Sequence, residues 1–131
     1  MSESEFVAQF ESVTLPPDQF THAAHVRVAW WYLTQAPLPE ALARFSAALR
    51  RFATAHGAAA KYHETITVAW MLILAERVDN LHGAAWPDFA AANADLFVRS
   101  PSPLALYYRD ETLASERARR VFVMPDRAFT H

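Results

Sequence analysis

The chain has 131 residues, of which 53% are hydrophobic and 20% are charged, and its formal net charge is −2 at pH 7. A chain of this size and composition is expected to form one folded domain, residues 1–131, with enough apolar side chains for a buried core. Acidic and basic residues are interspersed and nearly balanced, which disfavours nucleic acid and anionic membrane surfaces as partners.

Several classes of chemistry are excluded by what the sequence lacks. It contains no cysteine, so disulfide bonds, thiolate nucleophiles and cysteine-ligated zinc are ruled out, and its two glycines are too few for a glycine-rich phosphate loop. The first residues, Met-Ser-Glu-Ser-Glu-Phe, are acidic where a secretory signal peptide is basic. No apolar run reaches the length that a membrane span needs. We therefore expect a cytoplasmic protein without a membrane segment.

The first third of the chain predicts two helices. Apolar residues recur at helical spacing between positions 6 and 13, and the Leu-Pro-Pro sequence at 15–17 ends that short helix. A second helix is expected to begin at Thr21, whose hydroxyl can cap it, and to end before Pro37. Between its histidines and Leu33 this helix has only Arg27 to offer to water. We therefore expect the second helix to be buried at the centre of the molecule.

The remaining sequence also favours helices, with no repeat and no strand pattern. Further helices are expected from Glu40 to near Gly57, from about Ala59 to Val78, from Pro87 onward, after the proline-rich turn at 100–103, and from Thr112 to Arg120. The apolar segment 121–124 is expected to lie back across the other helices. The predicted fold is all-α, a single compact bundle of about five to seven helices around a buried central helix.

Two histidines near the start of the central helix are the first candidates for a functional site. His22 and His25 are three positions apart, which on a helix places both imidazoles on one face. The helix dipole disfavours positive charge near a helix N-terminus, so both rings are expected to be neutral. A neutral imidazole is the form that ligates a metal ion or acts as a base.

A second stretch that opens with a histidine, residues 62–74, adds His63 and Glu64. If the two helices meet, His22, His25, His63 and Glu64 together form a nitrogen and oxygen ligand set of the kind that binds zinc, iron or manganese. Adjacent residues are about 100° apart around a helix, so His63 and Glu64 can share one ion only where the helix begins. A divalent metal site is therefore one hypothesis for these four residues.

Two alternatives to a metal site stay open. The histidines and Glu64 can line a polar pocket without metal, in which a small organic molecule binds. They can also be structural, with His22 and His25 bonded to tyrosine, threonine or backbone groups in the core, and Glu64 complementing the start of a helix.

Tyr62, Thr67 and Trp70 are the candidate wall of such a pocket. Thr67 and Trp70 lie one and two helical turns beyond His63 on the same face, so a groove between two helices could have histidine at its floor and tryptophan on its wall. Such a groove suits a small organic ligand. The alternative for Trp70 is an ordinary core position, which is the more common role of a single aromatic residue.

Tyr107 and Tyr108 form a second ligand-binding candidate together with Arg109. These residues follow the proline-rich turn, where phenols and a guanidinium group could close over an anionic ligand. The alternative is that the tyrosines cover one end of the helical bundle. Both possibilities are compatible with the sequence.

Several segments resemble a group of small uncharacterised bacterial proteins. They are F-T-H-A-A-H-V-R-V-A at 20–29, K-Y-H-E-T-I-T at 61–67, Y-Y-R-D-E-T-L-A-S-E-R-A-R at 107–119, and M-P-D at 124–126. The resemblance covers most of the chain. It implies a recurring, stand-alone helical domain and brings no established activity.

The sequence therefore leads to two functional hypotheses. The first is a histidine-rich pocket between helices that binds a small molecule, with a possible divalent metal. If the protein is an enzyme, a neutral histidine would act as general base or hold a metal-bound water, and Glu64 would relay the proton. The second is a non-catalytic module that binds a partner protein through an exposed aromatic patch, with structural histidines.

Overall fold

The computed structural model describes residues 1–127, and within that range it is all-α, as predicted. Its helices are α1 (Glu3–Glu11), α2 (His22–Gln35), α3 (Leu38–Ala55), α4 (Glu64–Asn80), α5 (Trp86–Ala92), α6 (Asp110–Leu113) and α7 (Glu116–Arg120). Short 3-10 turns connect them: η1 (Pro17–Gln19), η2 (Ala59–Lys61), η3 (Ala94–Phe97) and η4 (Pro103–Leu106). None of the helices in residues 1–127 has the length and apolar character that crossing a membrane requires.

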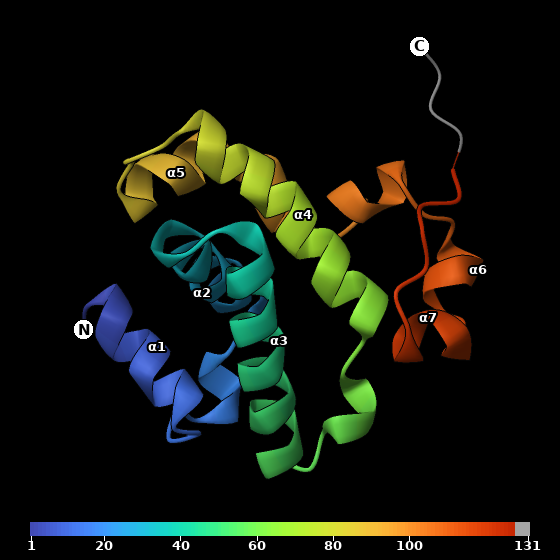
Figure 1. Ribbon diagram of the computed structural model, residues 1–131, viewed down its shortest axis with the longest axis horizontal. Helices are drawn as coiled ribbons and strands as arrows, with labels where there is room; N and C mark the ends of the chain where they lie inside the picture. The colour runs from blue at the N-terminus through green and yellow to red at the C-terminus, as the bar shows by residue number, and fades with distance from the viewer. Residues whose placement is uncertain (128–131) are drawn as a thin grey trace.

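Helix α2 is the centre of the fold, in agreement with the prediction (Figure 1). Helices α1, α3 and α4 pack against it, and η3 approaches it from the other half of the chain. Val26, Val28, Ala29 and Tyr32 of α2 are completely inaccessible to solvent. Because helix faces of this kind are stabilised by the apolar area they bury, α2 needs neighbours on several sides.

The ends of α2 form where the sequence indicates. The Thr21 hydroxyl accepts a hydrogen bond of 3.2 Å from the backbone N–H of Ala24, which satisfies a free donor of the first turn. At the other end Ala36 is extended, with φ −154°, as expected for a residue before proline. Pro37 then precedes α3, which buries one stripe of side chains: Ala41, Phe45, Ala48 and Phe52.

The start of α4 differs from the prediction. A helix was expected from about Ala59, but residues 59–61 form only a 3-10 turn and α4 begins at Glu64. Gly57 adopts φ 69°, the left-handed conformation expected of a residue that ends a helix. His63 is extended and its side chain caps α4, which fixes the first turn at Glu64 rather than farther upstream.

Helices α5 to α7 are shorter than the sequence suggests. Helix α5 begins at Trp86, one residue before Pro87, and stops at Ala92, so Leu96 and Phe97 lie on η3 and not on the helix expected from Pro87 onward. The helix expected from Thr112 to Arg120 is divided into α6 and α7. The division occurs because Ser115 is extended and its hydroxyl accepts a hydrogen bond of 3.1 Å from the Ala118 N–H, starting a new helix.

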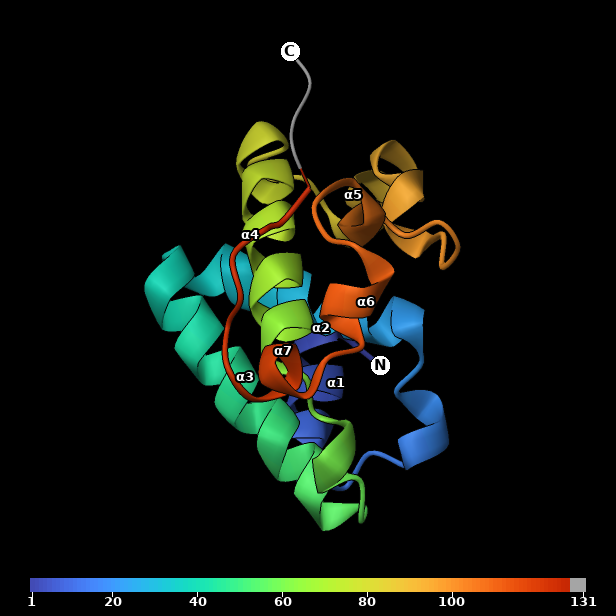
Figure 2. The same ribbon diagram turned by 90° about the vertical axis from the view of Figure 1, so that its right-hand side faces the viewer.

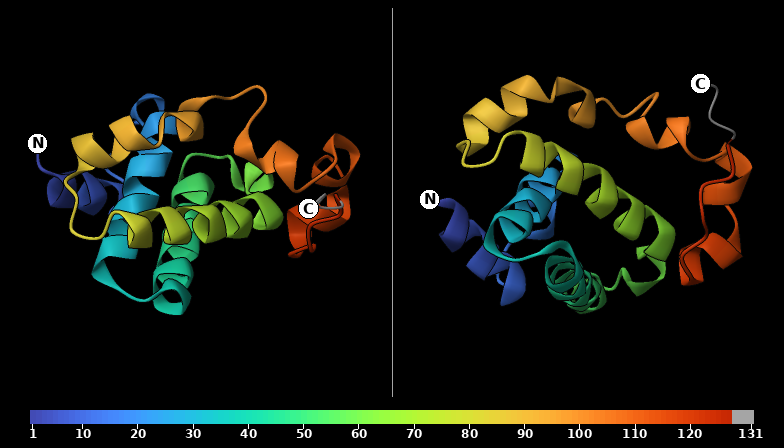
Figure 3. Two further views of the ribbon diagram at one scale, coloured as in Figure 1. Left: turned by 90° about the horizontal axis from the view of Figure 1, so that it is seen from above. Right: turned by 45° about the horizontal axis from the view of Figure 1, so that its top comes forward.

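The segment after α7 runs back along α4, as the apolar sequence at 121–124 predicts (Figure 2). The hydroxyl of Thr65, a residue with no exposed surface, donates to the Val121 carbonyl at 2.9 Å and accepts from the Val123 N–H at 3.0 Å. The Tyr108 hydroxyl donates to the Val123 carbonyl at 2.6 Å. Two buried hydroxyl groups therefore hold this extended segment in place, and Figure 3 shows α6 and α7 at the same side of the molecule.

Replacing Thr65 tests how strongly this segment is attached. Thr65→Val keeps the side-chain shape but leaves the Val121 carbonyl and the Val123 N–H without their partner, so the free energy of unfolding should fall by about 2–3 kcal/mol. Urea denaturation measures this loss. Thr65→Ser, which keeps the hydroxyl, should lose clearly less, and Thr54→Val on an exposed site of α3 should stay close to the original value. Equal losses for Thr65→Val and Thr65→Ser would contradict the role of the hydroxyl.

Candidate functional site

A cleft of about 560 Å³ opens where the C-terminal end of α3 and the N-terminal end of α4 approach η1 and α2. Its apolar wall is formed by seven side chains: Pro17, Phe20, Leu49, Phe52, Ala53, Ala58 and Ile66. Its polar side chains are His25, His56, Lys61, Tyr62, His63 and Thr67. The cleft is thus mostly apolar with a few polar groups, which is the usual composition of a site for a small molecule.

His25 is the residue of this cleft with the most unusual environment. Its ring packs edge-on against Phe20 and Phe45, with centroid distances of 5.7 Å and 5.3 Å. Within residues 1–127, no protein group forms a hydrogen bond with its imidazole. Burial, with a smaller contribution from the neighbouring His22, lowers the pKa of His25 to about 4. The ring is therefore neutral at pH 7, and its nitrogens are available to a bound molecule.

The lowered pKa of His25 predicts a pH dependence of stability. Its ordinary value is 6.5, so between that value and about 4 the unfolded chain binds a proton that the folded protein does not. The free energy of unfolding should therefore decrease as the pH falls through this window, by at most about 3 kcal/mol from this residue. Chemical denaturation at a series of pH values measures the decrease.

The non-titrating variant His25→Gln identifies the source of this dependence. Its stability should fall less steeply than that of the original protein between pH 6.5 and 4, since the proton uptake of one histidine is removed. His82→Gln, at an exposed position outside the cleft, serves as the matched control and should keep the original slope. Identical slopes for His25→Gln and the original protein would show that His25 does not cause the effect.

Both ring nitrogens of His63 form hydrogen bonds with the protein. Nδ1 accepts from the Ile66 N–H at 3.1 Å and caps α4, so Nε2 carries the proton and donates to the Leu113 carbonyl at 2.7 Å. The Thr67 hydroxyl donates to the His63 backbone carbonyl at 2.8 Å. His63 therefore lines the cleft as a fixed side chain that joins α4 to α6, and has no free nitrogen for a metal ion or a proton.

His63 variants separate these two hydrogen bonds. His63→Ala removes both and should lower the free energy of unfolding by about 2–3 kcal/mol, since a cap and a partly buried side-chain bond are each worth about 1 kcal/mol. His63→Asn can still cap the helix but cannot reach Leu113 in the same way, so about half of that loss should be recovered. The midpoints of urea denaturation give the comparison. A value for His63→Asn as low as that for His63→Ala would argue against the capping role.

His22 points to a different neighbour from His25, although both are on the first turn of α2. Its Nε2 lies 2.9 Å from the Leu96 carbonyl of η3, and its ring packs edge-on against Trp70 at 5.6 Å. Trp70 is 5% exposed and is not among the residues that line the cleft. His22 and Trp70 thus connect α2, α4 and η3, and the predicted tryptophan wall is part of the core.

The carboxylate of Glu64 accepts hydrogen bonds from two neighbouring side chains beside the cleft. One carboxylate oxygen accepts from the Tyr62 hydroxyl at 2.7 Å and from the Arg50 guanidinium at 3.1 Å. The same guanidinium lies over the Tyr62 ring, 4.7 Å from its centroid. Burial and the hydrogen bond to Glu64 raise the pKa of Tyr62, so its phenol stays protonated. The three side chains form a closed polar cluster that orients Tyr62 along the cleft.

The structure does not bring the predicted metal ligands together. Among residues 1–127, no three histidine, aspartate or glutamate side chains are arranged to hold a metal ion. His22 faces Leu96, His63 uses both nitrogens, and Glu64 is bonded to Tyr62 and Arg50. Helix α4 does begin at Glu64, as sharing of one ion by His63 and Glu64 would require. The two side chains nevertheless bind different partners. This geometry does not form a ligand set from His22, His25, His63 and Glu64.

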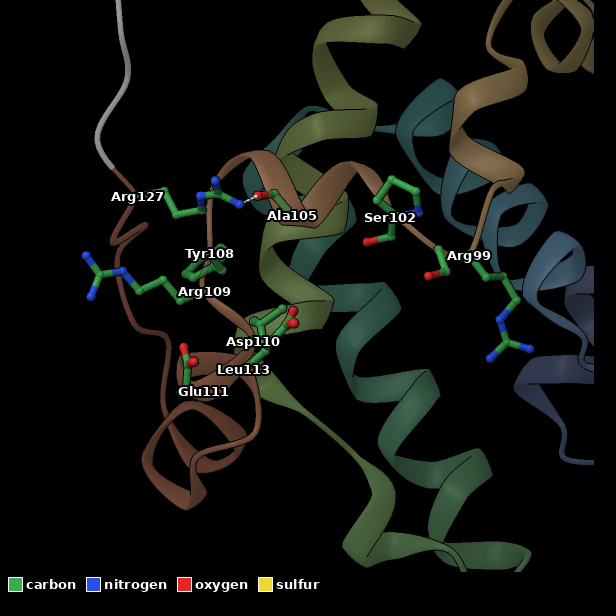
Figure 4. Close-up of a pocket in the computed structure, with 11 residues that line it drawn as sticks. Arg99, Ser102, Ala105, Tyr108, Arg109, Asp110, Glu111, Leu113 and Arg127 are labelled. Carbon is green, nitrogen blue, oxygen red and sulfur yellow. Dashed lines mark hydrogen bonds between the residues drawn. The ribbon is translucent and has the colours of Figure 1, made fainter.

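Tyr107 and Tyr108 lie away from this cleft. Both line a small apolar hollow of about 130 Å³ beside Leu72 and Phe122, and Tyr108 also borders a more polar hollow of about 510 Å³. Figure 4 shows that in this second hollow the guanidinium groups of Arg99 and Arg109 point away from each other rather than toward a common centre. Tyr107 and Arg109 border different hollows with Tyr108 between them, and closure of these three residues over an anionic ligand stays a prediction.

Comparison with known proteins adds no relative from which a function could be carried over. No protein-family model, curated protein or solved structure matches the chain. The chemistry of the cleft is therefore the basis for assigning a function.

Nine further cleft residues were not predicted to be part of a site: Pro17, Phe20, Leu49, Phe52, Ala53, His56, Ala58, Lys61 and Ile66. Phe20 and Phe52 have a centroid distance of 5.2 Å and form an aromatic wall, whereas His56 and Lys61 lie at the exposed rim. Of these, Leu49 and Phe52 are three positions apart, a helical spacing that the sequence shows without linking it to a site. The exposed rim residues had no local pattern that could have identified them.

Proposed function

We propose that this protein binds a small organic molecule in the cleft beside His25. The observation that carries the proposal is the imidazole of His25, which lines a cleft of about 560 Å³ and forms no hydrogen bond with the described part of the chain. The His25 side chain is partly exposed where it lines the cleft, so its ring nitrogens can be reached by a ligand or by solvent. The volume falls within the range of roughly 300–1,000 Å³ that is common for ligand pockets.

The walls of the cleft define the body of the ligand. Phe20 and Phe52 present aromatic surface, and Leu49 and Ile66 add aliphatic surface. An aromatic or otherwise flat apolar molecule would pack against these rings, while His25 would bind one polar atom of it. The absence of cysteine fits a reducing cytoplasmic setting, and the chain's net charge of −2 favours a small molecule over nucleic acid as the partner.

Binding is better supported than proton transfer at this cleft. A neutral imidazole can accept a proton, but a base with a pKa of about 4 is weak at pH 7 and is far from the value that favours general base catalysis. His63, the other histidine of the inner cleft, uses both nitrogens in structural bonds. We therefore propose recognition of the ligand as the function and assign no reaction.

Filling the cleft tests this proposal. Ala53→Phe places a large side chain on the wall, and Ala47→Phe makes the same change at an exposed position of the same helix, outside the cleft. Binding is measured with naphthalene-based probes by fluorescence titration. The original protein and Ala47→Phe should bind alike, and Ala53→Phe should bind at least about tenfold more weakly because a blocked pocket excludes the ring. Probe binding that Ala53→Phe leaves unchanged, or no probe binding at all, would refute the proposed site.

A second candidate function is non-catalytic binding of a partner protein. Val98 and Leu106 are 46% and 68% exposed, and both line a shallow apolar hollow near Pro101 and Pro103. Exposed apolar side chains of this kind occur at protein interfaces. Single exposed apolar residues are also common on any protein surface, which is why this candidate ranks second.

A further inference from the structure

We propose that the ligand of the His25 cleft is an anion, specifically an aromatic carboxylate whose negative group is bound by Lys61. This inference rests on the proposed binding function and adds the chemical class of the ligand. Three features of the cleft support it: the charges that line it, the lack of a charged partner for Lys61 among residues 1–127, and the order of apolar and charged groups from the inside to the rim.

The cleft is lined by no carboxylate. The chain has 14 aspartate and glutamate residues and a net charge of −2, yet all the titratable side chains along the cleft belong to histidine, lysine or tyrosine. The nearest carboxylate, Glu64, accepts hydrogen bonds from Tyr62 and Arg50 and is not among the lining residues. The ammonium group of Lys61 thus gives the cleft a positive charge on a protein that is negative overall, which favours an anion.

Lys61 has no charged partner in the part of the chain that the structure describes. Within residues 1–127, no aspartate or glutamate forms an ion pair with its ammonium group. Its backbone is fixed in η2, where its N–H donates to the Ala58 carbonyl at 2.9 Å, so the side chain starts from a defined position beside the cleft. A carboxylate on the ligand would supply the missing partner in a charge-assisted hydrogen bond.

The groups of the cleft follow an order that an amphipathic ligand would match. His25 packs against Phe45, which has no exposed surface, so it belongs to the core side of the cleft. Phe20 and Phe52 form the aromatic wall, and Lys61 is exposed at the rim. A flat ring with a hydrogen-bonding atom at one end and a carboxylate at the other would satisfy His25 and Lys61 while burying its apolar part.

The probe 6-hydroxy-2-naphthoate has both polar ends, and 2-naphthol is the same ring system with the hydroxyl and without the carboxylate. Fluorescence titrations of both probes are made with the original protein, with Lys61→Gln, and with Arg99→Gln as an exposed cation control outside the cleft. The carboxylate probe should bind about tenfold more tightly than 2-naphthol to the original protein, as expected for one charge-assisted contact. Lys61→Gln should remove this advantage while binding 2-naphthol as before, and Arg99→Gln should preserve it.

The outcomes separate this inference from the proposed function. Equal affinity of the two probes, or a carboxylate advantage that survives in Lys61→Gln, overturns the anion proposal. If Ala53→Phe still abolishes binding of 2-naphthol in that case, the cleft remains a binding site for neutral molecules. Failure of both probes to bind overturns both proposals. Loss of binding of both probes in Lys61→Gln also counts against the inference, because it would indicate damage to the cleft rather than loss of a charge contact.

Discussion

The two hydrogen bonds of the His63 imidazole determine where α4 begins and how α6 packs against it. Its Nδ1 sets the first residue of α4, and its Nε2 reaches the carbonyl of Leu113, fifty positions farther along the chain. These two hydrogen bonds select the neutral tautomer in which Nε2 carries the proton and Nδ1 accepts. The same ring therefore fixes both the start of α4 and the packing of α6. The wall of the cleft that α4 contributes, with Ile66 and Thr67, follows directly from that position.

The core of the fold can be predicted from the sequence because it depends on local patterns. The central helix has almost no polar face, so any fold of this chain must cover it, and Thr21 and Pro37 mark its ends. The start of α4 was misplaced because the alanines at 58–60 have high helix propensity, whereas histidine is not among the preferred capping residues. The hydrogen bond to the Leu113 carbonyl orients His63. A contact between residues fifty positions apart cannot be predicted from a short stretch of sequence.

The site was predicted only in part, for a related reason. Four of the residues that the sequence singled out, His25, Tyr62, His63 and Thr67, line one cleft, and their role in binding stays a prediction. They do not reveal that His22 turns to the carbonyl of Leu96 or that Glu64 is taken up by Arg50, because backbone carbonyls and distant guanidinium groups carry no signature in a histidine motif. Two histidines one turn apart can therefore have separate environments, one bonded within the core and one open to a ligand.

Among residues 1–127, those that line the cleft all lie between Pro17 and Thr67. The part of α4 that shapes the cleft is nevertheless held by the second half of the chain, through Leu113 on His63 and through Val121 and Val123 on Thr65. Leu113, Val121 and Val123 thus hold α4 in position beside the cleft without lining it. Substitutions at Leu113, Val121 or Val123 would shift the α4 wall of the cleft without removing a lining residue, so the affinity for the proposed ligand would depend on residues far from the cleft.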